Sequence, residues 1–228
     1  MIFLDRPSIE FNFPDDVLYM HYRKVEIPKG IKYLVTPCSG TDHIDFGYCK
    51  NNNIKVIYLD DKKWLYENVY ATAEHTVYLM LRALKHRKKR SEGYNRELRG
   101  KVVGIIGFGR IGQQVSHILK GFGCTIMSSD NGIENLFYEC DIITVHVPLT
   151  DETRGLIKIN LLSDFLKSGG VFVNVSRPEI VEDCHGDFES VISSDYGHIT
   201  NHMAGFTKES RIKTDEYVRE RLMECLNK

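Results

Sequence analysis

Apolar positions follow two spacings that alternate along the chain from about residue 100 to residue 205. Short, nearly uninterrupted apolar runs predict buried strands of a parallel sheet, because both faces of such strands are covered. Segments with apolar residues every three or four positions follow them and predict helices. We expect strands at 101–106, 124–128, 141–146, 170–175, 191–194 and 198–200, and helices at 113–122 and 160–167. The alternation predicts an α/β fold with a doubly wound, mostly parallel sheet.

The flanking segments are less regular. Residues 1–60 contain two strand candidates, at 33–36 and 55–59, with a loop and a short helix between them. We expect a loop at 61–72, and little more than a turn between Asp130 and Cys140. Two longer amphipathic patterns predict helices at 72–90 and 208–226.

A glycine-rich turn follows the strand expected at 101–106. Gly107, Gly109 and Gly112 form the pattern Gly-x-Gly-x-x-Gly, and Asp130 lies eighteen residues after the last of them. The first glycine suits a tight turn, the second allows a pyrophosphate to approach the backbone, and the third allows the helix to pack closely. An acid after the second strand can accept hydrogen bonds from ribose hydroxyls, which favours NAD over NADP. The segment therefore predicts a Rossmann dinucleotide-binding domain; the alternative is a glycine-rich turn in another βαβ unit.

Composition and charge narrow the class of protein. The 228 residues are 42% hydrophobic and carry a formal net charge of −1, so nothing favours nucleic acid or membrane as a partner. The six cysteines are scattered and no signal peptide is evident, which is typical of a reduced, cytoplasmic protein. We expect no metal site, since Cys184, His185 and Asp187 form the only local cluster and fit a polar loop. The basic run at 85–90 fits a solvated helix end.

Six ordered blocks of sequence carry a resemblance to a known family. They are Ser39-Gly-Thr-Asp-His-Ile-Asp45, Ala71-Thr-Ala-Glu-His-Thr76, Gly104-Ile-Ile-Gly-Phe-Gly-Arg-Ile-Gly112, Asp141-Ile-Ile-Thr-Val-His-Val-Pro-Leu-Thr150, Val173-Asn-Val-Ser-Arg177 and His202-Met-Ala-Gly205. In these blocks the chain resembles the D-isomer-specific 2-hydroxyacid dehydrogenases, including their D-3-phosphoglycerate dehydrogenase branch. The resemblance spans about residues 33–225.

The resemblance implies an NAD-binding Rossmann domain inserted in a smaller, truncated α/β substrate domain. On this basis residues 72–206 form the NAD-binding domain, and residues 1–71 with 207–228 form the reduced substrate lobe. It further implies hydride transfer between the nicotinamide and C2 of a small D-2-hydroxy or 2-oxo acid. The family pairs through the helix that matches 72–90, which implies a homodimer.

The matched blocks also imply roles for single residues. Arg177 matches the arginine that holds the substrate carboxylate, although a surface ion pair is the alternative. His202 matches the acid/base histidine, with a structural histidine as the alternative. Ser39 and Gly40 match the loop that binds substrate through backbone N–H groups.

Other matched positions are implied to contact NAD. Arg110 and Ile111 match residues at the pyrophosphate. His146 and Pro148 match a strand end beside the adenosine, where a histidine need not do chemistry. The remaining expected cofactor contacts are Ser176, Asp195 and Gly205, besides the three glycines and Asp130 of the turn.

The chain departs from the family pattern after Arg177. Only twenty-five positions separate Arg177 from His202, and the glutamate that hydrogen-bonds the family histidine has no clear counterpart. Glu189 and Asp195 are the candidates to replace it. Two functions stay open: a shortened but active dehydrogenase, or an NAD(H)-binding relative that is regulatory or has lost catalysis. The sequence does not identify the acid.

Overall fold

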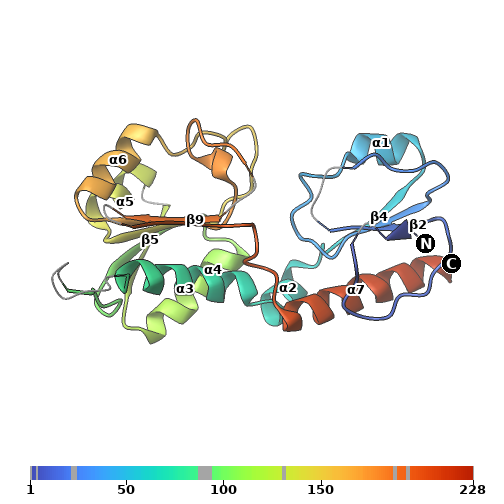
Figure 1. Ribbon diagram of the computed structural model, residues 1–228, viewed down its shortest axis with the longest axis horizontal. Helices are drawn as coiled ribbons and strands as arrows, with labels where there is room; N and C mark the ends of the chain where they lie inside the picture. Colours follow the sequence, from blue (N-terminus) through green and yellow to red (C-terminus); the bar gives the residue numbers. More distant parts are fainter. Residues whose placement is uncertain are drawn as a thin grey trace. The chain divides into compact units, whose positions relative to one another are not determined.

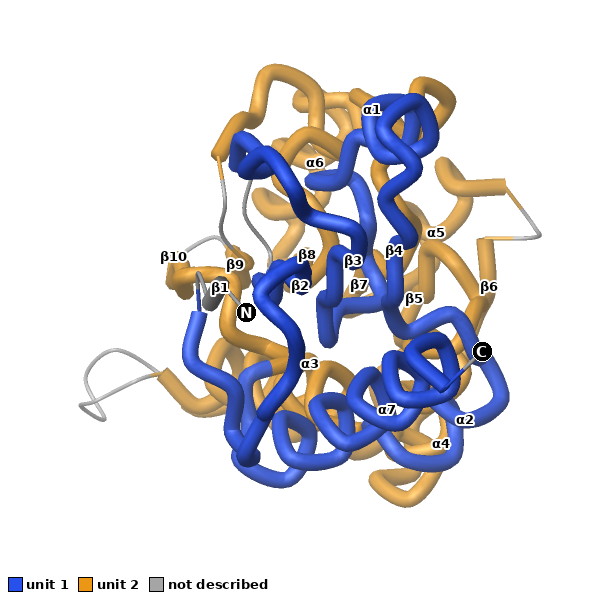
Figure 2. The backbone as a smooth tube through the Cα atoms, turned by 90° about the vertical axis from the view of Figure 1, so that its right-hand side faces the viewer, with its two compact units in different colours: residues 1–69, 206–228 blue, residues 70–205 orange. Residues whose placement is uncertain are grey.

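The protein forms two compact units, each with its own sheet and apolar core. The computed structural model describes residues 2–3 (backbone only), 5–21, 25–86, 94–129, 132–186, 189–193 and 196–227. Unit 1 comprises Met1–Val69 with Phe206–Lys228, and unit 2 comprises Tyr70–Gly205 (Figure 2). The chain therefore begins and ends in unit 1, and unit 2 is one continuous insertion.

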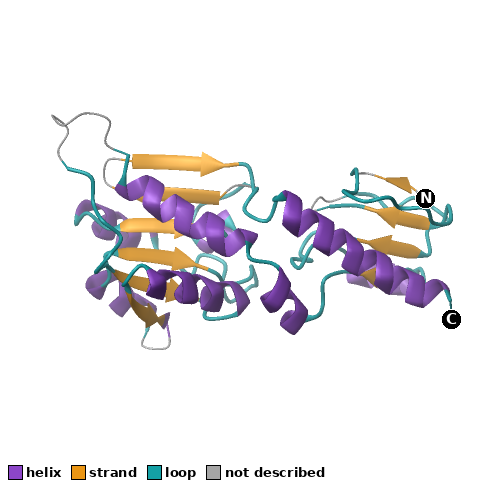
Figure 3. Ribbon diagram, turned by 90° about the horizontal axis from the view of Figure 1, so that it is seen from below, coloured by secondary structure: helices purple, strands orange, loops and turns teal. Residues whose placement is uncertain are grey.

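Unit 2 is built on a sheet of six strands in the order β10-β9-β8-β7-β5-β6. These are β5 (Val102–Ile106), β6 (Thr125–Ser128), β7 (Ile142–Val145), β8 (Val171–Asn174), β9 (Glu189–Ser193) and β10 (Tyr196–Thr200). The first four run parallel, and this confirms the predicted α/β fold with a mostly parallel sheet (Figure 3). The six strands include every one expected from the apolar runs of this unit.

The direction of β9 distinguishes this sheet from a uniformly parallel one. β9 pairs antiparallel with β8, and β10 pairs antiparallel with β9. Between β8 and β9 the described residues form only one short 3₁₀ helix, Pro178–Ile180. A parallel return needs a crossover, usually a helix; here the chain turns back at the edge where β8 ends. β10 then runs in the direction of β8 and ends at that same carboxyl edge.

Two pairs of helices cover the two faces of this sheet. α3 (Ala71–Leu84) and α4 (Arg110–Gly121) lie on one face, and α5 (Ile133–Glu139) and α6 (Ile159–Lys167) lie on the other (Figure 1). Successive strand residues alternate between the two cores: Ile105 packs on the α3–α4 side and Ile106 on the α5–α6 side. Full burial of such side chains stabilises the fold by about 1.5–3 kcal/mol each.

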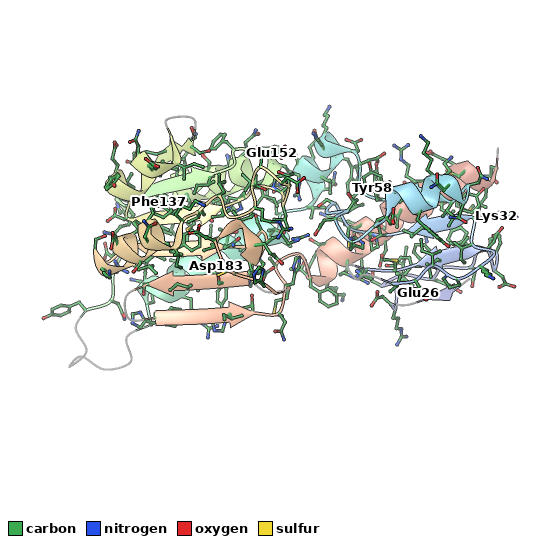
Figure 4. All side chains as sticks on the ribbon, turned by 90° about the horizontal axis from the view of Figure 1, so that it is seen from above. Glu26, Lys32, Tyr58, Phe137, Glu152 and Asp183 are labelled. Atoms are coloured by element: carbon green, nitrogen blue, oxygen red, sulfur yellow. The ribbon has the colours of Figure 1, made fainter. Side chains whose placement is uncertain are left out.

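Helix α5 corrects the expectation of a mere turn between Asp130 and Cys140. Gly132, at φ +93°, precedes its first turn, and Leu136 and Phe137 are buried. The Phe137 ring, labelled in Figure 4, lies 5.4 Å from the Phe165 ring of α6 between centroids, edge to face. Two buried apolar side chains in seven residues are too few for a periodic signal, but they are enough to anchor a helix to a core.

Helix α3 is shorter than the sequence pattern suggested. It ends at Leu84, and its C-cap Lys85 is the first residue of the basic run. Residues 87–90 lie outside the described part of the chain. The buried face of α3 still includes Val77, Leu79 and Met80, as the periodicity predicted.

Unit 1 holds a four-stranded parallel sheet in the order β1-β2-β3-β4. The strands are β1 (Ile2–Phe3), β2 (Val17–Tyr19), β3 (Tyr33–Val35) and β4 (Lys55–Ile57). β3 and β4 agree with the sequence pattern, whereas β1 and β2 were not foreseen because two or three residues give no periodicity. Helix α1 (Phe46–Asn51) covers one face, and α2 (Lys62–Asn68) and α7 (Lys208–Leu226) cover the other (Figure 1). On the α1 side the Phe46 ring lies 5.9 Å from that of Tyr58, labelled in Figure 4.

Helix α2 corrects the expected loop at 61–72. The Asp61 carboxylate caps it by accepting a hydrogen bond from the Trp64 N–H at 2.9 Å, and Leu65 is buried. Trp64 packs against Tyr217 of α7, with ring centroids 4.5 Å apart. The aspartate cap three residues ahead of an apolar pair was the available sequence signal.

A buried aspartate ties α7 to the rest of unit 1. The Asp215 carboxylate accepts hydrogen bonds from the Tyr19 hydroxyl and from both the N–H and the hydroxyl of Ser8. Burial, and then the bond to Asp215, raise the pKa of Tyr19 far above its usual range. No described helix is long and apolar enough to cross a membrane.

Candidate functional site

Four loops of unit 2 start at the carboxyl edge of its sheet. They follow β5, β7, β8 and β10, whose chain directions agree (Figure 3). The loops carry the glycine turn, His146, Arg177 and His202 respectively. Ligands of doubly wound folds bind at this edge, so the topology brings these predicted site residues to one side of the unit.

The glycine turn has the geometry of a phosphate cradle. Gly107 adopts φ +92°, and a Cβ on it would lie 2.7 Å from Cγ1 of Val147. A Cβ on Gly112 would lie 2.3 Å from the carbonyl oxygen of Gly107. A Cβ on Gly109, in contrast, would meet nothing described within 4 Å. Two glycines are therefore required by close packing, and the third leaves open space that a pyrophosphate can use.

The open position lies at the start of α4. Gly109 is the N-cap, and Arg110 and Ile111 are the first two helical residues. The backbone N–H groups of the first turn have no carbonyl partner within the helix, and with the helix dipole they favour an anion. Nη1 of Arg110 lies 3.5 Å from Oε1 of Gln114, and burial lowers the pKa of Arg110. Ile111 packs against the α3–α4 core, so its side chain fixes the helix while its backbone faces the turn.

Two predicted cofactor contacts, Asp130 and Asp195, lie outside the described residues. Ser129, the residue before Asp130, accepts a hydrogen bond from the Gly107 N–H at 3.4 Å. The end of β6 is thus joined to the glycine turn.

His146 is held as a neutral side chain. Its Nε2 lies 3.0 Å from the Thr144 hydroxyl, and its Nδ1 is buried with no hydrogen-bond partner in the described structure. Burial lowers the pKa of His146 to about 3. A group with that pKa does not exchange a proton near neutral pH. Pro148, two residues on, is exposed, and its carbonyl accepts a hydrogen bond from the Thr153 hydroxyl at 2.6 Å.

Arg177 stands on a turn that is fixed by Asn174. The Asn174 side chain accepts from the Ser176 N–H at 2.9 Å and donates to the Arg177 carbonyl at 2.8 Å. The Ser176 hydroxyl donates to the Val145 carbonyl at 3.1 Å, which ties the turn to β7. Pro178 then starts the 3₁₀ helix. Sequence reasoning missed Asn174; a polar residue that ends an apolar strand was its signal.

His202 lies in the loop after β10. Its N–H donates to the Thr200 carbonyl at 3.0 Å, and its φ of +36° is in the left-handed region. Gly205 ends the block, and a Cβ there would lie 3.8 Å from the Thr72 hydroxyl at the start of α3.

Glu189 anchors the loop that carries His202. Its carboxylate, with the residue 1% exposed, accepts from the Ala204 N–H at 2.7 Å and from the Thr200 hydroxyl at 2.8 Å. Nε2 of His75 lies 3.3 Å from its Oε2. Burial raises the pKa of Glu189, but the adjacent His75 and the hydrogen bonds from Ala204 and Thr200 outweigh burial and lower the pKa overall.

The predicted substrate residues Ser39 and Gly40 belong to unit 1. They follow the carboxyl end of β3, and the loop is joined to the segment after β4 by a hydrogen bond from the Leu59 N–H to the Cys38 carbonyl, 3.2 Å long. Ser39 is exposed and Gly40 is half-buried. Among the described residues no three His, Cys, Asp or Glu side chains gather as a metal site would require.

Comparison with known proteins gives a consistent result. Residues 68–184 match the model of the D-isomer specific 2-hydroxyacid dehydrogenase NAD-binding domain. The chain is 31% identical to a D-specific alpha-keto acid dehydrogenase of Enterococcus faecalis, over 67% of this chain and 51% of that protein. It is 30% identical to a hydroxypyruvate reductase of Thermotoga maritima, over 74% and 60%. The chain thus spans about half to three-fifths of these curated relatives.

A solved structure supports the fold. The chain superimposes on NAD⁺-bound 3-phosphoglycerate dehydrogenase from Entamoeba histolytica with a TM-score of 0.73. The match has 24% sequence identity and covers 93% of this chain and 79% of that one.

Proposed function

Since the chain belongs to the D-isomer specific 2-hydroxyacid dehydrogenase family and carries its NAD-binding domain, we propose that it is an NAD-dependent oxidoreductase. It transfers a hydride between the nicotinamide and C2 of a small D-2-hydroxy or 2-oxo acid. The main support for this proposal is the arrangement at the carboxyl edge of the unit 2 sheet. There the glycine turn, Arg177 and His202 each follow the end of a strand.

The residues of the glycine turn fit the cofactor. Gly109 leaves space for the pyrophosphate, and the N–H groups of Arg110 and Ile111 stabilise its charge at the helix N-terminus. When bound, NAD supplies or accepts the hydride. On the family resemblance, Asp130 would bind the ribose, His146 and Pro148 would lie on the adenosine side, and Ser176, Asp195 and Gly205 would be further cofactor contacts.

Arg177 binds the substrate carboxylate. Its guanidinium presents parallel N–H donors that match a carboxylate in a bidentate pair. The Asn174 side chain fixes the backbone of Ser176 and Arg177 and so sets where that guanidinium starts.

His202 moves the proton. It donates a proton to the forming alkoxide in reduction and accepts one from the hydroxyl in oxidation, which is the general acid and base role of a histidine. His146 is unsuited to this role, because burial lowers its pKa to about 3.

The substrate class follows from these groups. One guanidinium suits one carboxylate, the group that every 2-oxo acid carries. The two curated relatives are named for D-specific alpha-keto acids and for hydroxypyruvate, both in this class. We further propose a homodimer formed through α3, which sedimentation velocity of the purified chain tests.

A second candidate function rests on one observation. The interval from Arg177 to His202 is short, and within it β9 reverses direction. A domain shortened in this way could bind NAD(H) as a regulatory or non-catalytic relative.

Turnover assays separate the two functions. NADH oxidation is followed at 340 nm with glyoxylate, pyruvate, hydroxypyruvate, phosphohydroxypyruvate and 2-oxoglutarate, and NADH binding is followed by fluorescence. For the dehydrogenase we expect turnover with at least one acid, and a fall of roughly 10²–10⁴ in His202→Ala at unchanged NADH affinity. Tight NADH binding without turnover on every acid would favour the regulatory function.

A further inference from the structure

The carboxylate of Glu189 is a charged group in the core of unit 2 that hydride transfer does not itself use. The residue is 1% exposed, on the first position of β9. Burying a charged carboxylate strongly destabilises the folded state unless hydrogen-bond donors compensate for its lost hydration. Here Oε1 accepts from the Ala204 N–H, and Oε2 accepts from the Thr200 hydroxyl and lies beside His75. The two donors lie at the end of β10 and in the loop after it, and the neighbouring His75 belongs to α3.

The contacts of Glu189 lie on both sides of His202. Thr200 is two residues before it and Ala204 is two residues after it, and one carboxylate holds both. Glu189 also pairs with Thr200 in the register of β9 and β10, so the sheet fixes the backbone from which its side chain extends. The reversal of β9 brings Glu189 to this edge, because β9 begins where the parallel strands end.

The loop between these anchors is strained. His202 has φ +36°, a conformation that is unfavourable for a non-glycine residue and persists only when the surroundings impose it. Without the carboxylate the Ala204 N–H would lose its partner in the interior, and the loop could relax toward ordinary backbone angles. The ring of His202 would then move away from its present position.

We propose that Glu189 is a positioning residue, which clamps the His202 loop through Thr200 and Ala204 and is itself held by His75. This rests on the proposed function, since it assigns His202 the proton transfer. Glu189 thereby takes the place of the family's orienting glutamate, and it acts on the loop backbone.

Glu189→Gln is the direct test. The amide keeps the size of the side chain but removes its charge and one acceptor oxygen. We expect kcat to fall about a hundredfold, as for a reacting group displaced by about 1 Å, while KM and NADH affinity stay within about twofold. Glu182→Gln is the matched control, because Glu182 pairs with Lys158 and the Ile159 N–H at the surface and should leave kcat unchanged.

A second readout is independent of turnover. The imidazole signals of His202 are identified in ¹H–¹⁵N spectra by their loss in His202→Gln. We expect Glu189→Gln to shift or broaden these signals while the glycine-turn amides keep their NADH response. Unchanged His202 signals, or an unchanged kcat, would overturn the proposal. If the protein turns over none of the acids, the proposed function fails, but the spectra still decide whether Glu189 clamps the loop.

A milder variant covers the case in which Glu189→Gln does not fold. Thr200→Val keeps the β-branched shape and removes one of the two direct loop donors. We expect a smaller shift of the same His202 signals and a fall in kcat of about threefold to tenfold. No shift in this variant would contradict the clamp.

Discussion

At the scale of single residues, a few positions decide whether the site exists. Gly107 and Gly112 are fixed by contacts that a single methyl group would violate, and Asn174 and Glu189 fix the backbone on which Arg177 and His202 stand. The glycines, Arg177 and His202 could be proposed as site residues from sequence, because each lies in a short block of sequence. Asn174 was not predicted, although its partners are two and three residues away, because a single polar residue at a strand end does not reveal which groups it binds. Glu189 could be identified only as a candidate, because its partners lie on other elements.

The close packing at Gly112 gives the first prediction. In Gly112→Ala the new Cβ would lie 2.3 Å from a backbone carbonyl, so α4 must shift at the turn. We expect NADH affinity to fall at least about tenfold and the free energy of unfolding to fall by about 1–3 kcal/mol. Fluorescence titration and urea unfolding measure the two effects.

Gly121→Ala is the control for that substitution. Gly121 ends the same helix, and a Cβ on it meets nothing described within 4 Å. Alanine there should leave NADH affinity unchanged and stabilise the helix slightly. Equal NADH affinity in both variants would contradict the assigned role of Gly112.

We expect the stability of the folded chain to depend on pH through His146, whose Nδ1 is buried. Its pKa is about 3 in the folded chain and about 6.5 in the unfolded chain, so below pH 6.5 the unfolded chain gains a proton that the folded one does not. Its contribution to stability is complete above pH 6.5 and is lost as pH falls toward 3, at up to about 1.4 kcal/mol per pH unit.

Urea unfolding by circular dichroism at pH 7 and pH 5 measures this effect. The free energy of unfolding should fall less between these pH values in His146→Gln than in the wild type. His117→Gln serves as control, since His117 is exposed on α4. An identical pH dependence in wild type and His146→Gln would show that His146 is not buried as a neutral group.

At the scale of elements, periodicity was a sound guide wherever an element was long. The parallel strands of unit 2 and helices α3, α4, α6 and α7 were all expected from apolar spacing. α2 and α5 were missed because seven residues with one or two buried apolar side chains give no period. The antiparallel direction of β9 could not be predicted from its sequence either. It follows from the lack of a crossover helix among the described residues between β8 and β9.

We expect the N-terminal cap of α2 to contribute to the stability of unit 1. Asp61→Ala removes the acceptor of the Trp64 N–H and should lower the stability of unit 1 by about 1 kcal/mol. Trp64 is the single tryptophan of the chain and lies in this helix, so its fluorescence during urea unfolding reports on unit 1. Asp61→Asn keeps a capping oxygen and should cost much less; equal losses in the two variants would argue against the cap.

At the scale of the whole molecule, the two units differ in how the chain builds them and in which predicted site residues they contain. Unit 2 holds the cofactor turn, Arg177 and His202, and it is continuous in sequence, which is why its motifs were readable in order. Unit 1 holds Ser39 and Gly40, and it is completed by α7 from the other end of the chain through the buried Asp215. Unit 1 therefore depends on a helix that follows His202 in the chain.

We propose direct hydride transfer to C2 of the substrate, with His202 as the proton donor. The measurement is single-turnover reduction of the preferred 2-oxo acid with NADH deuterated at C4 of the nicotinamide, with mass analysis of the product. We predict one deuterium at C2 of a D-2-hydroxy acid, and a loss of about 10²–10⁴ in rate in His202→Ala at equal NADH occupancy. Product without deuterium at C2, or an equal rate in His202→Ala, would contradict the account.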